Sequence, residues 1–170
     1  MAHKEALREL QTRLAERLQA ARTQERPSAW LAVECAGRGL LLPLEQAGEI
    51  FQRVPLVAVP HARPWFAGVA NLRGGLFGVV DLARFLGLET RAGDEARLVA
   101  LNPALQLNCA LLVERLAGLR SAPQLARHAE QPASKPAFVG TRYADDAGRA
   151  WQELNLAALA VDDGFMTIAA

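Results

Sequence analysis

The sequence has few of the residues on which most catalytic and metal sites depend. Its 170 residues include three histidines and two cysteines. Cys35 and Cys109 stand too far apart for a Cys-x-x-Cys zinc motif, and we expect them to be small buried residues. The sequence contains no Gly-x-Ser-x-Gly elbow, phosphate loop or His-Glu-x-x-His motif. The carboxylate pairs 145–146 and 162–163 lack the interleaved oxygens of a calcium loop and are predicted to form turns. We therefore predict a protein that is not an enzyme and has no metal or cofactor.

An excess of charge is also absent. The chain has 19 basic and 18 acidic side chains, a formal net charge of +1, which disfavours a nucleic acid partner. No apolar run reaches the roughly 18 residues of a membrane span, and the charged N-terminus lacks the apolar core of a secretory signal. Hydrophobic residues make up 51% of the chain, enough for a folded core. These features predict a cytoplasmic globular protein.

The first 26 residues are predicted to form an amphipathic helix. Leu7, Leu10, Leu14 and Leu18 recur at helical spacing, and Pro27 ends the pattern. The apolar stripe requires a surface to cover it. That surface is either the chain's own domain, a partner helix or a second copy.

After residue 29 the apolar residues follow a period of two, which indicates strands. Proline- and glycine-containing turns separate these runs, and residues 121–136 are predicted to be a surface loop. Pro43 removes a backbone donor, so its strand is expected at a sheet edge or bulge. The predicted strands are 31–35, 40–44, 56–59, 66–72, 76–80, 97–101, 105–113, 116–119, 138–143 and 149–154.

The two halves of the chain repeat one pattern. In each, Phe-x-Gly opens a hairpin that leads into a short helix, with Asp81 and Asn155 as the predicted N-caps. Small sheets avoid exposed edges by closing into barrels, and two barrels side by side leave a groove. We therefore predict an all-β fold with short helices, in which a domain of residues 29–165 follows the leading helix. Lobe one covers about residues 36–90 and lobe two about residues 93–165, and the first strand is open to sharing between them.

The segment 66–88 is the most informative part of the sequence. It reads Phe-Ala-Gly-Val-Ala-Asn-Leu-Arg-Gly-Gly, a strand, then Val-Asp-Leu and a short helix ending in Leu-Gly. This segment resembles the signature of the CheW-like coupling proteins of bacterial chemosensory arrays. Residues 42–50 contain a proline in a predicted strand, followed by a Glu-Ile pair. This stretch resembles a second sequence pattern of the same family. The leading helix and the divergent second lobe are most similar to the PilI branch, which serves type IV pilus twitching motility.

The resemblance implies two five-stranded, SH3-like β-barrels and a non-enzymatic adaptor. Its partners would be the regulatory domain of a CheA-type histidine kinase and the cytoplasmic tip of a methyl-accepting chemoreceptor. The receptor hairpin is expected in the groove between lobes, and the kinase at barrel ends, within membrane-associated receptor arrays. Two alternatives are a flagellar chemotaxis CheW proper and a stand-alone SH3-like module that binds peptide or RNA. The second alternative expects Trp30, Trp65 and Trp151 to form an exposed aromatic groove.

The resemblance also implies partner-binding residues, namely Glu49, Gly68, Asn71, Arg73 and Gly74. Glu49 and Arg73 are expected to form an ion pair, which is structural if buried and available to a partner if exposed. Gly68 is expected either to keep a binding surface clear or to relieve crowding on its own strand. Asn71 and Gly74 are expected to form the hairpin turn.

Overall fold

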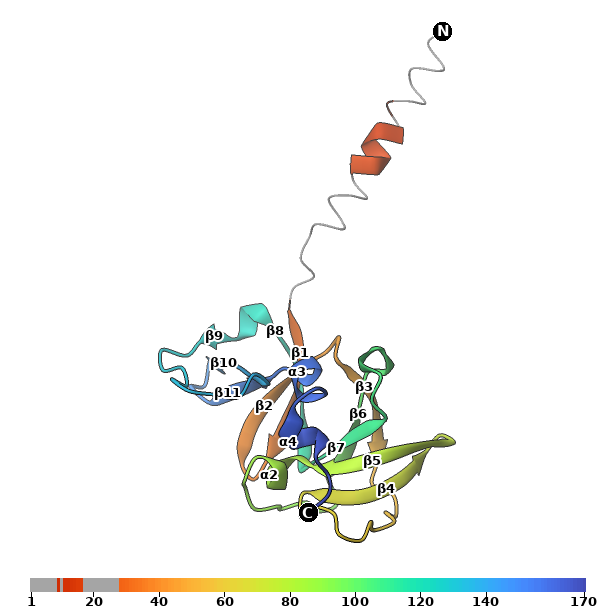
Figure 1. Ribbon diagram of the computed structural model, residues 1–170. Coiled ribbons are helices and arrows are strands. Elements are labelled where there is room, and N and C mark those ends of the chain that lie inside the picture. The colour runs from red at the N-terminus through yellow and green to blue at the C-terminus, as the bar shows by residue number, and fades with distance from the viewer. Residues whose placement is uncertain (1–8, 10, 17–27) are drawn as a thin grey trace.

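Two packed β-sheets make up most of the fold in the computed structural model (Figure 1). The structure describes residue 9, residues 11–16 and residues 28–170. One sheet has six strands in the order β8 (Arg115–Ser121), β1 (Ala29–Cys35), β2 (Arg38–Pro43), β11 (Ala150–Leu154), β10 (Val139–Ala144) and β9 (Ala126–Arg127). The other has five in the order β3 (Ala47–Gln52), β6 (Arg97–Leu101), β7 (Cys109–Val113), β5 (Gly75–Asp81) and β4 (Phe66–Leu72).

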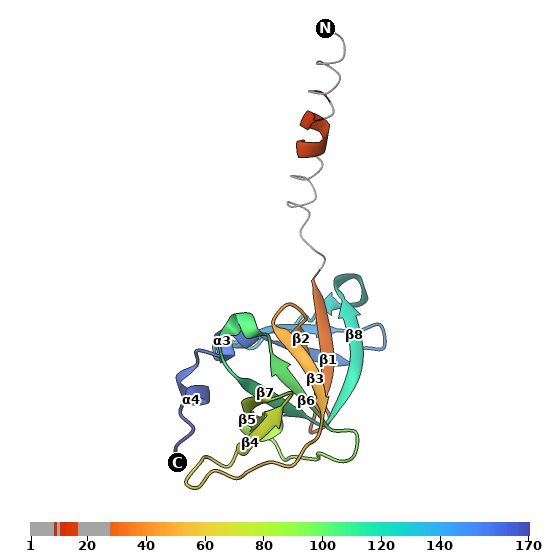
Figure 2. The same ribbon diagram turned by 90° about the vertical axis from the view of Figure 1, so that its right-hand side faces the viewer.

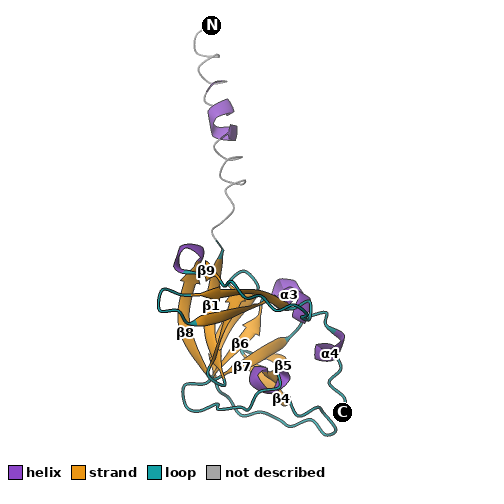
Figure 3. Ribbon diagram, turned by 90° about the vertical axis from the view of Figure 1, so that its left-hand side faces the viewer, coloured by secondary structure: helices purple, strands orange, loops and turns teal. Residues whose placement is uncertain are grey.

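Short helices lie around the strands (Figure 3). They are α2 (Leu82–Phe85), α3 (Leu156–Leu159) and α4 (Asp163–Met166), with 3-10 turns η1 (Pro103–Leu105) and η2 (Ala122–Gln124). The Asp81 carboxylate accepts a hydrogen bond from the Arg84 amide, and the Asn155 side chain accepts one from the Ala158 amide. Both predicted N-caps are confirmed, as is the repeated hairpin-and-helix pattern. The predicted mostly β fold of two lobes is confirmed.

The two sheets exchange strands between the halves of the chain (Figure 2). β6 and β7 pair with β3 and β5, although the expected division at about residues 90–93 would have placed them in the second lobe. β1 and β2 pair with β8 and β11. Each sheet contains one pair of parallel neighbours, β5 with β7 in the five-stranded sheet and β2 with β11 in the six-stranded sheet. Parallel neighbours need a long connection and leave no hairpin signal in the sequence, so the repeat alone did not predict this exchange.

Several strands are buried on both faces. On β6, Leu98 packs inside the five-stranded lobe, whereas Val99 packs against the six-stranded sheet. On β1, Trp30 packs inside the six-stranded lobe and Val33 faces the other way. The two lobes therefore share a third core between them, in addition to one core inside each.

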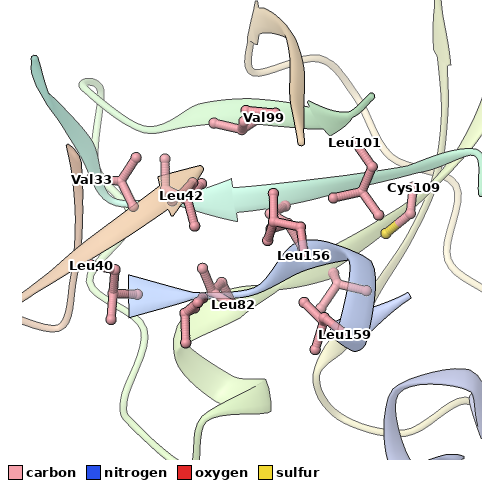
Figure 4. Packing of buried hydrophobic residues seen from close by; sticks show 14 of the residues in the cluster. Val33, Leu40, Leu42, Leu82, Val99, Leu101, Cys109, Leu156 and Leu159 are labelled. Atoms are coloured by element: carbon pink, nitrogen blue, oxygen red, sulfur yellow. The ribbon is translucent and has the colours of Figure 1, made fainter. Parts of the chain in front are cut away.

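The shared core contains side chains from both sheets and from the helices α2, α3 and α4 (Figure 4). Leu82 of α2 and Leu156 of α3 are fully buried in it. Gln46, in the turn after β2, accepts hydrogen bonds from the amides of Leu156 and Ala157 at 2.7 and 3.3 Å. Apolar burial and these bonds hold the start of α3 against the connection between the lobes.

The five-stranded lobe closes through a single bridge rather than a full strand. Val57 and Val69 exchange two backbone hydrogen bonds of 2.9 Å, which joins the segment after β3 to β4. The predicted strand 56–59 is thus reduced to one pair, and β3 was not predicted. Residues 47–52 alternate weakly because a bulge between Ala47 and Ile50 shifts the register.

Two further expectations need correction. β2 is an interior strand, because it pairs with both β1 and β11; Pro43 is tolerated at its last position, beyond the pairing with β11. Gly39 also lies within β2, where a Cβ would be 2.6 Å from the Trp151 ring. The 121–136 loop contains the short elements η2 and β9.

Most of the predicted leading helix, residues 1–26, lies outside the described residues. Residue 9 and residues 11–16 are described, and they are helical and exposed. The three alternatives for covering the apolar stripe, namely the chain's own domain, a partner helix or a second copy, stay predictions. Among the described residues, no helix is long and apolar enough to cross a membrane.

The shared core predicts a large difference between two identical substitutions. Leu156→Ala would leave a cavity where both lobes and α3 meet, and we expect it to lower the free energy of unfolding by about 2–5 kcal/mol. Leu76→Ala, at a side chain 66% exposed, is expected to cost less than about 1 kcal/mol. Urea unfolding followed by tryptophan fluorescence measures both. Similar losses for the two variants would contradict the shared core.

Candidate functional site

The β4–β5 hairpin ends in a tight turn formed by Arg73 and Gly74. Both residues have positive φ, 48° and 80°, as a type I′ hairpin turn requires. The Asn71 side-chain oxygen accepts a hydrogen bond of 2.9 Å from the Gly74 amide. Leu72 and Gly75 are the pair that closes the turn. The expected turn-forming roles of Asn71 and Gly74 therefore agree with the geometry, and the turn projects Arg73 from the sheet.

The Arg73 guanidinium reaches Glu49 on β3. Arg73 Nη2 lies 2.8 Å from Glu49 Oε1, and the two side chains are 77% and 42% exposed. Of the two alternatives, the structure has the exposed ion pair, a kind that contributes only about 0–1 kcal/mol to stability. Exchanging Glu49 for a partner's carboxylate would thus cost the fold little.

Exposed apolar side chains accompany this ion pair. Leu76 is the cross-strand neighbour of Asn71 and is 66% exposed, and Ile50 follows Glu49 and is 39% exposed. Arginine is enriched among the residues that contribute most to the binding energy of protein interfaces. We call Glu49, Ile50, Asn71, Arg73 and Leu76 the hairpin surface.

Gly68 lies in β4, away from the turn, and its role is steric. Its φ is +134°, and a Cβ at this position would lie 2.4 Å from the Val57 carbonyl oxygen. The neighbouring Val69 forms the bridge to Val57 that closes the lobe. Of the five predicted site residues, four therefore lie together at the hairpin surface or its turn, and Gly68 supports the strand behind it.

A groove of about 670 Å³ opens between the lobes, and no single residue of it was predicted. The segment after α2 forms one wall, and β2, β10 and β11 form the other. Its lining includes Leu40, Leu86, Leu88, Val139, Arg142 and Arg149. A groove between lobes was expected from the fold, but these side chains come from four separate segments that sequence spacing does not bring together.

A buried carboxylate with two arginine partners stands beside this groove. Glu34 is 7% exposed. Arg115 donates two hydrogen bonds to it, of 2.6 and 2.8 Å, and Arg149 donates a further short one. The cluster joins β1 to β8 and to the start of β11. A lone glutamate within the apolar run 30–35 was the available sequence signal, since a buried charge requires partners.

Electrostatics keep Glu34 ionised. Burial acts to raise its pKa, but the hydrogen bonds and charges of Arg115 and Arg149 outweigh burial and hold the pKa below its ordinary value. Burial alone raises the pKa of the Cys109 thiol to about 12, and it is the largest of several influences that raise the pKa of the Cys35 thiol to the same value. Both cysteines are free and buried, as predicted.

The tryptophans are core residues rather than a binding platform. Trp30 and Trp151 are 4% and 1% exposed, and their ring nitrogens donate to Glu153 and Asp145. Trp65 is half-buried against the shared core. This placement counts against an exposed aromatic groove for peptide or RNA.

The first carboxylate pair serves a turn, as predicted, whereas the second begins a helix instead. Asp145 accepts hydrogen bonds from the amides of Ala147 and Arg149, and Asp162 caps α4. Within the part of the chain that the structure describes, no three His, Cys, Asp or Glu side chains gather as a metal site would require.

Three kinds of comparison with known proteins give consistent results. The family model described as the CheW-like domain matches residues 29–163. Protein PilI of Pseudomonas aeruginosa is 28% identical over 152 residues, which cover 86% of this chain and 84% of PilI. The crystal structure of the scaffolding protein TtCheW from Thermoanaerobacter tengcongensis superimposes with a TM-score of 0.64 at 18% identity, covering 75% of this chain and 88% of that one.

Gly68→Ala is expected to destabilise the five-stranded lobe. The added methyl group would collide with the Val57 carbonyl and would occupy a backbone conformation unfavourable to alanine, so the cost should exceed about 1 kcal/mol. Gly93→Ala is the matched control, because nothing lies within 4 Å of its Cβ position. Thermal unfolding of both variants tests this, and a neutral Gly68→Ala would refute the steric role.

The Glu34 cluster predicts a pH dependence. Because the folded-state pKa lies below the unfolded value of about 4.3, the stabilisation is present above that value and is lost as pH falls through the folded-state pKa. We expect Glu34→Gln to cost about 1–3 kcal/mol at neutral pH. Its free energy of unfolding should also fall less than that of the wild type between about pH 6 and pH 3.

Urea unfolding of both proteins across this pH range measures the difference. Asp145 also has a lowered pKa, mainly because Trp151 donates a hydrogen bond to it. Asp145 is present in both proteins, so its contribution cancels in the comparison. Parallel pH profiles for the two proteins would show that Glu34 does not carry the effect.

Proposed function

Because this chain belongs to the CheW-like domain family, we propose that it is a non-catalytic adaptor between a chemoreceptor and a histidine kinase. In this proposal the hairpin surface binds the regulatory domain of a CheA-type kinase. The inter-lobe groove binds the cytoplasmic tip of a methyl-accepting receptor. The protein would act in the cytoplasm, recruited to membrane-associated receptor arrays.

The exposed Arg73–Glu49 pair is the observation that supports this function most directly. It lies at the segment 66–88, which carries the resemblance to coupling proteins, and it is placed on a turn whose geometry Asn71 fixes. An ion pair that adds little to the fold and stands beside Leu76 suits a contact with another protein.

The pilus system is the proposed setting. The relative PilI spans nearly the whole of this chain, whereas the likeness to TtCheW at 18% identity bears on the fold alone. We therefore favour control of type IV pilus twitching motility over flagellar chemotaxis. Deleting the gene in its native host should reduce twitching and leave swimming unchanged.

A bridge passes a signal only if its contacts differ between receptor states. Both proposed surfaces involve the same rigid body, since the shared core joins the lobes. The receptor state would then reach the kinase through the relative position of the two bound partners.

Arg73→Asn tests the kinase surface without disturbing the turn. Asparagine tolerates positive φ, so the fold should remain intact while the charge and its reach are lost. We expect binding to a purified CheA-type regulatory domain to weaken at least about fivefold, which corresponds to roughly 1 kcal/mol. Isothermal titration measures the affinity and circular dichroism checks the fold.

Arg91→Asn is the control, an exposed arginine on another loop, and it should bind like the wild type. Unchanged affinity of Arg73→Asn would remove Arg73 from the kinase contact. Equal weakening by Arg91→Asn would point to net charge rather than to the hairpin surface.

A further inference from the structure

The inter-lobe groove combines an apolar surface with unpaired positive charge. Leu40, Val139 and Leu154 line one wall, and Leu86 and Leu88 line the other. A volume of about 670 Å³ exceeds what a small ion fills. A groove of this kind is the usual seat of an amphipathic helix, whose aliphatic side chains enter at successive turns.

Three arginines line the same groove, and no acidic side chain of the described residues does. Arg149 is already committed, since it pairs with Glu34 and stacks on the Trp151 ring at 4.6 Å. Arg38 and Arg142 are different. Among the residues that the structure describes, neither guanidinium has a carboxylate within ion-pair distance.

The two free arginines come from strands that the fold holds in place. Arg38 opens β2 and pairs with Cys35 of β1, and Arg142 lies within β10 opposite Gln152 of β11. The Arg142 amide donates to the Gln131 side chain, which also fixes the loop beside it. The backbones of both arginines are therefore held at fixed positions on the groove, and their guanidiniums are available to a partner.

We propose that this groove selects a helix with an aliphatic face and carboxylates along its margin, which pair with Arg38 and Arg142. The inference rests on the proposed function in taking the occupant to be a helical receptor segment, and it adds the charge by which this chain distinguishes among receptors. A helix with lysine at the same margin is rejected, because like charges face one another there.

The test uses three synthetic helical peptides of about 18 residues, roughly 27 Å long, with one aliphatic face in common. Their margins carry glutamate, glutamine or lysine. Fluorescence anisotropy measures binding to the full chain, and amide chemical shifts show where each peptide binds. We expect the glutamate peptide to bind the groove about three- to tenfold more tightly than the glutamine peptide and the lysine peptide to bind weakest.

Variants of the protein separate charge from shape. Arg38→Gln with Arg142→Gln should remove the preference for the glutamate peptide, and Arg142→Glu should shift it toward the lysine peptide. Arg53→Gln, an exposed arginine on the other lobe, should change nothing. Urea unfolding confirms that each variant is folded.

Three outcomes would overturn the proposal. They are equal binding of the three peptides to the wild type, shifts outside the groove, and equivalent shifts produced by inorganic phosphate alone, which would assign the arginines to a small anion. Binding of a receptor cytoplasmic fragment distinguishes a failure of charge selection from a failure of the adaptor role. If the fragment binds wild type and double variant alike, charge selection is wrong and the adaptor role stands; if it binds neither, the adaptor role is wrong.

Discussion

Burial of strands on both faces is the constraint on which the whole structure depends. β1, β2, β6 and β7 each present one face to the core of their own lobe and the other to the core between the lobes. Neither lobe can move without exposing Leu82, Val99 or Leu156 to water, at about 1.5–3 kcal/mol for each large aliphatic side chain. The strand exchange adds to this coupling, since each sheet contains strands from both halves of the chain.

This rigidity gives the two proposed surfaces their fixed geometry. The hairpin surface stands on β3 and the β4–β5 turn of one lobe, and the groove runs between that lobe and the other. Little stability depends on the exposed Arg73–Glu49 pair, whereas Glu34 is buried and its bonds to Arg115 and Arg149 join β1 to β8 and to the residue before β11. The charged residues that stabilise the fold are therefore different from the charged residues that are available to partners.

Sequence patterns predicted the parts of the fold that depend on neighbouring residues. The β4–β5 and β10–β11 hairpins and the caps Asp81 and Asn155 have local signals, in turn glycines and short polar side chains. The parallel pairing of β5 with β7 has none, which is why the lobe division differed. The turn at Asn71–Gly74 was predictable, but the exposure of Arg73 depends on where β3 places Glu49. The individual residues of the groove could not be predicted, because Leu88 and Arg142 come to line one groove only after both lobes pack.

The central claim is that one rigid chain holds two partners at once, through surfaces that do not overlap. Analytical ultracentrifugation of this protein with a CheA-type regulatory domain and a receptor cytoplasmic fragment tests it most directly. The proposed adaptor predicts a single sedimenting species that contains all three proteins. Two separate binary complexes, with the kinase domain and the receptor fragment displacing one another from the chain, would contradict it.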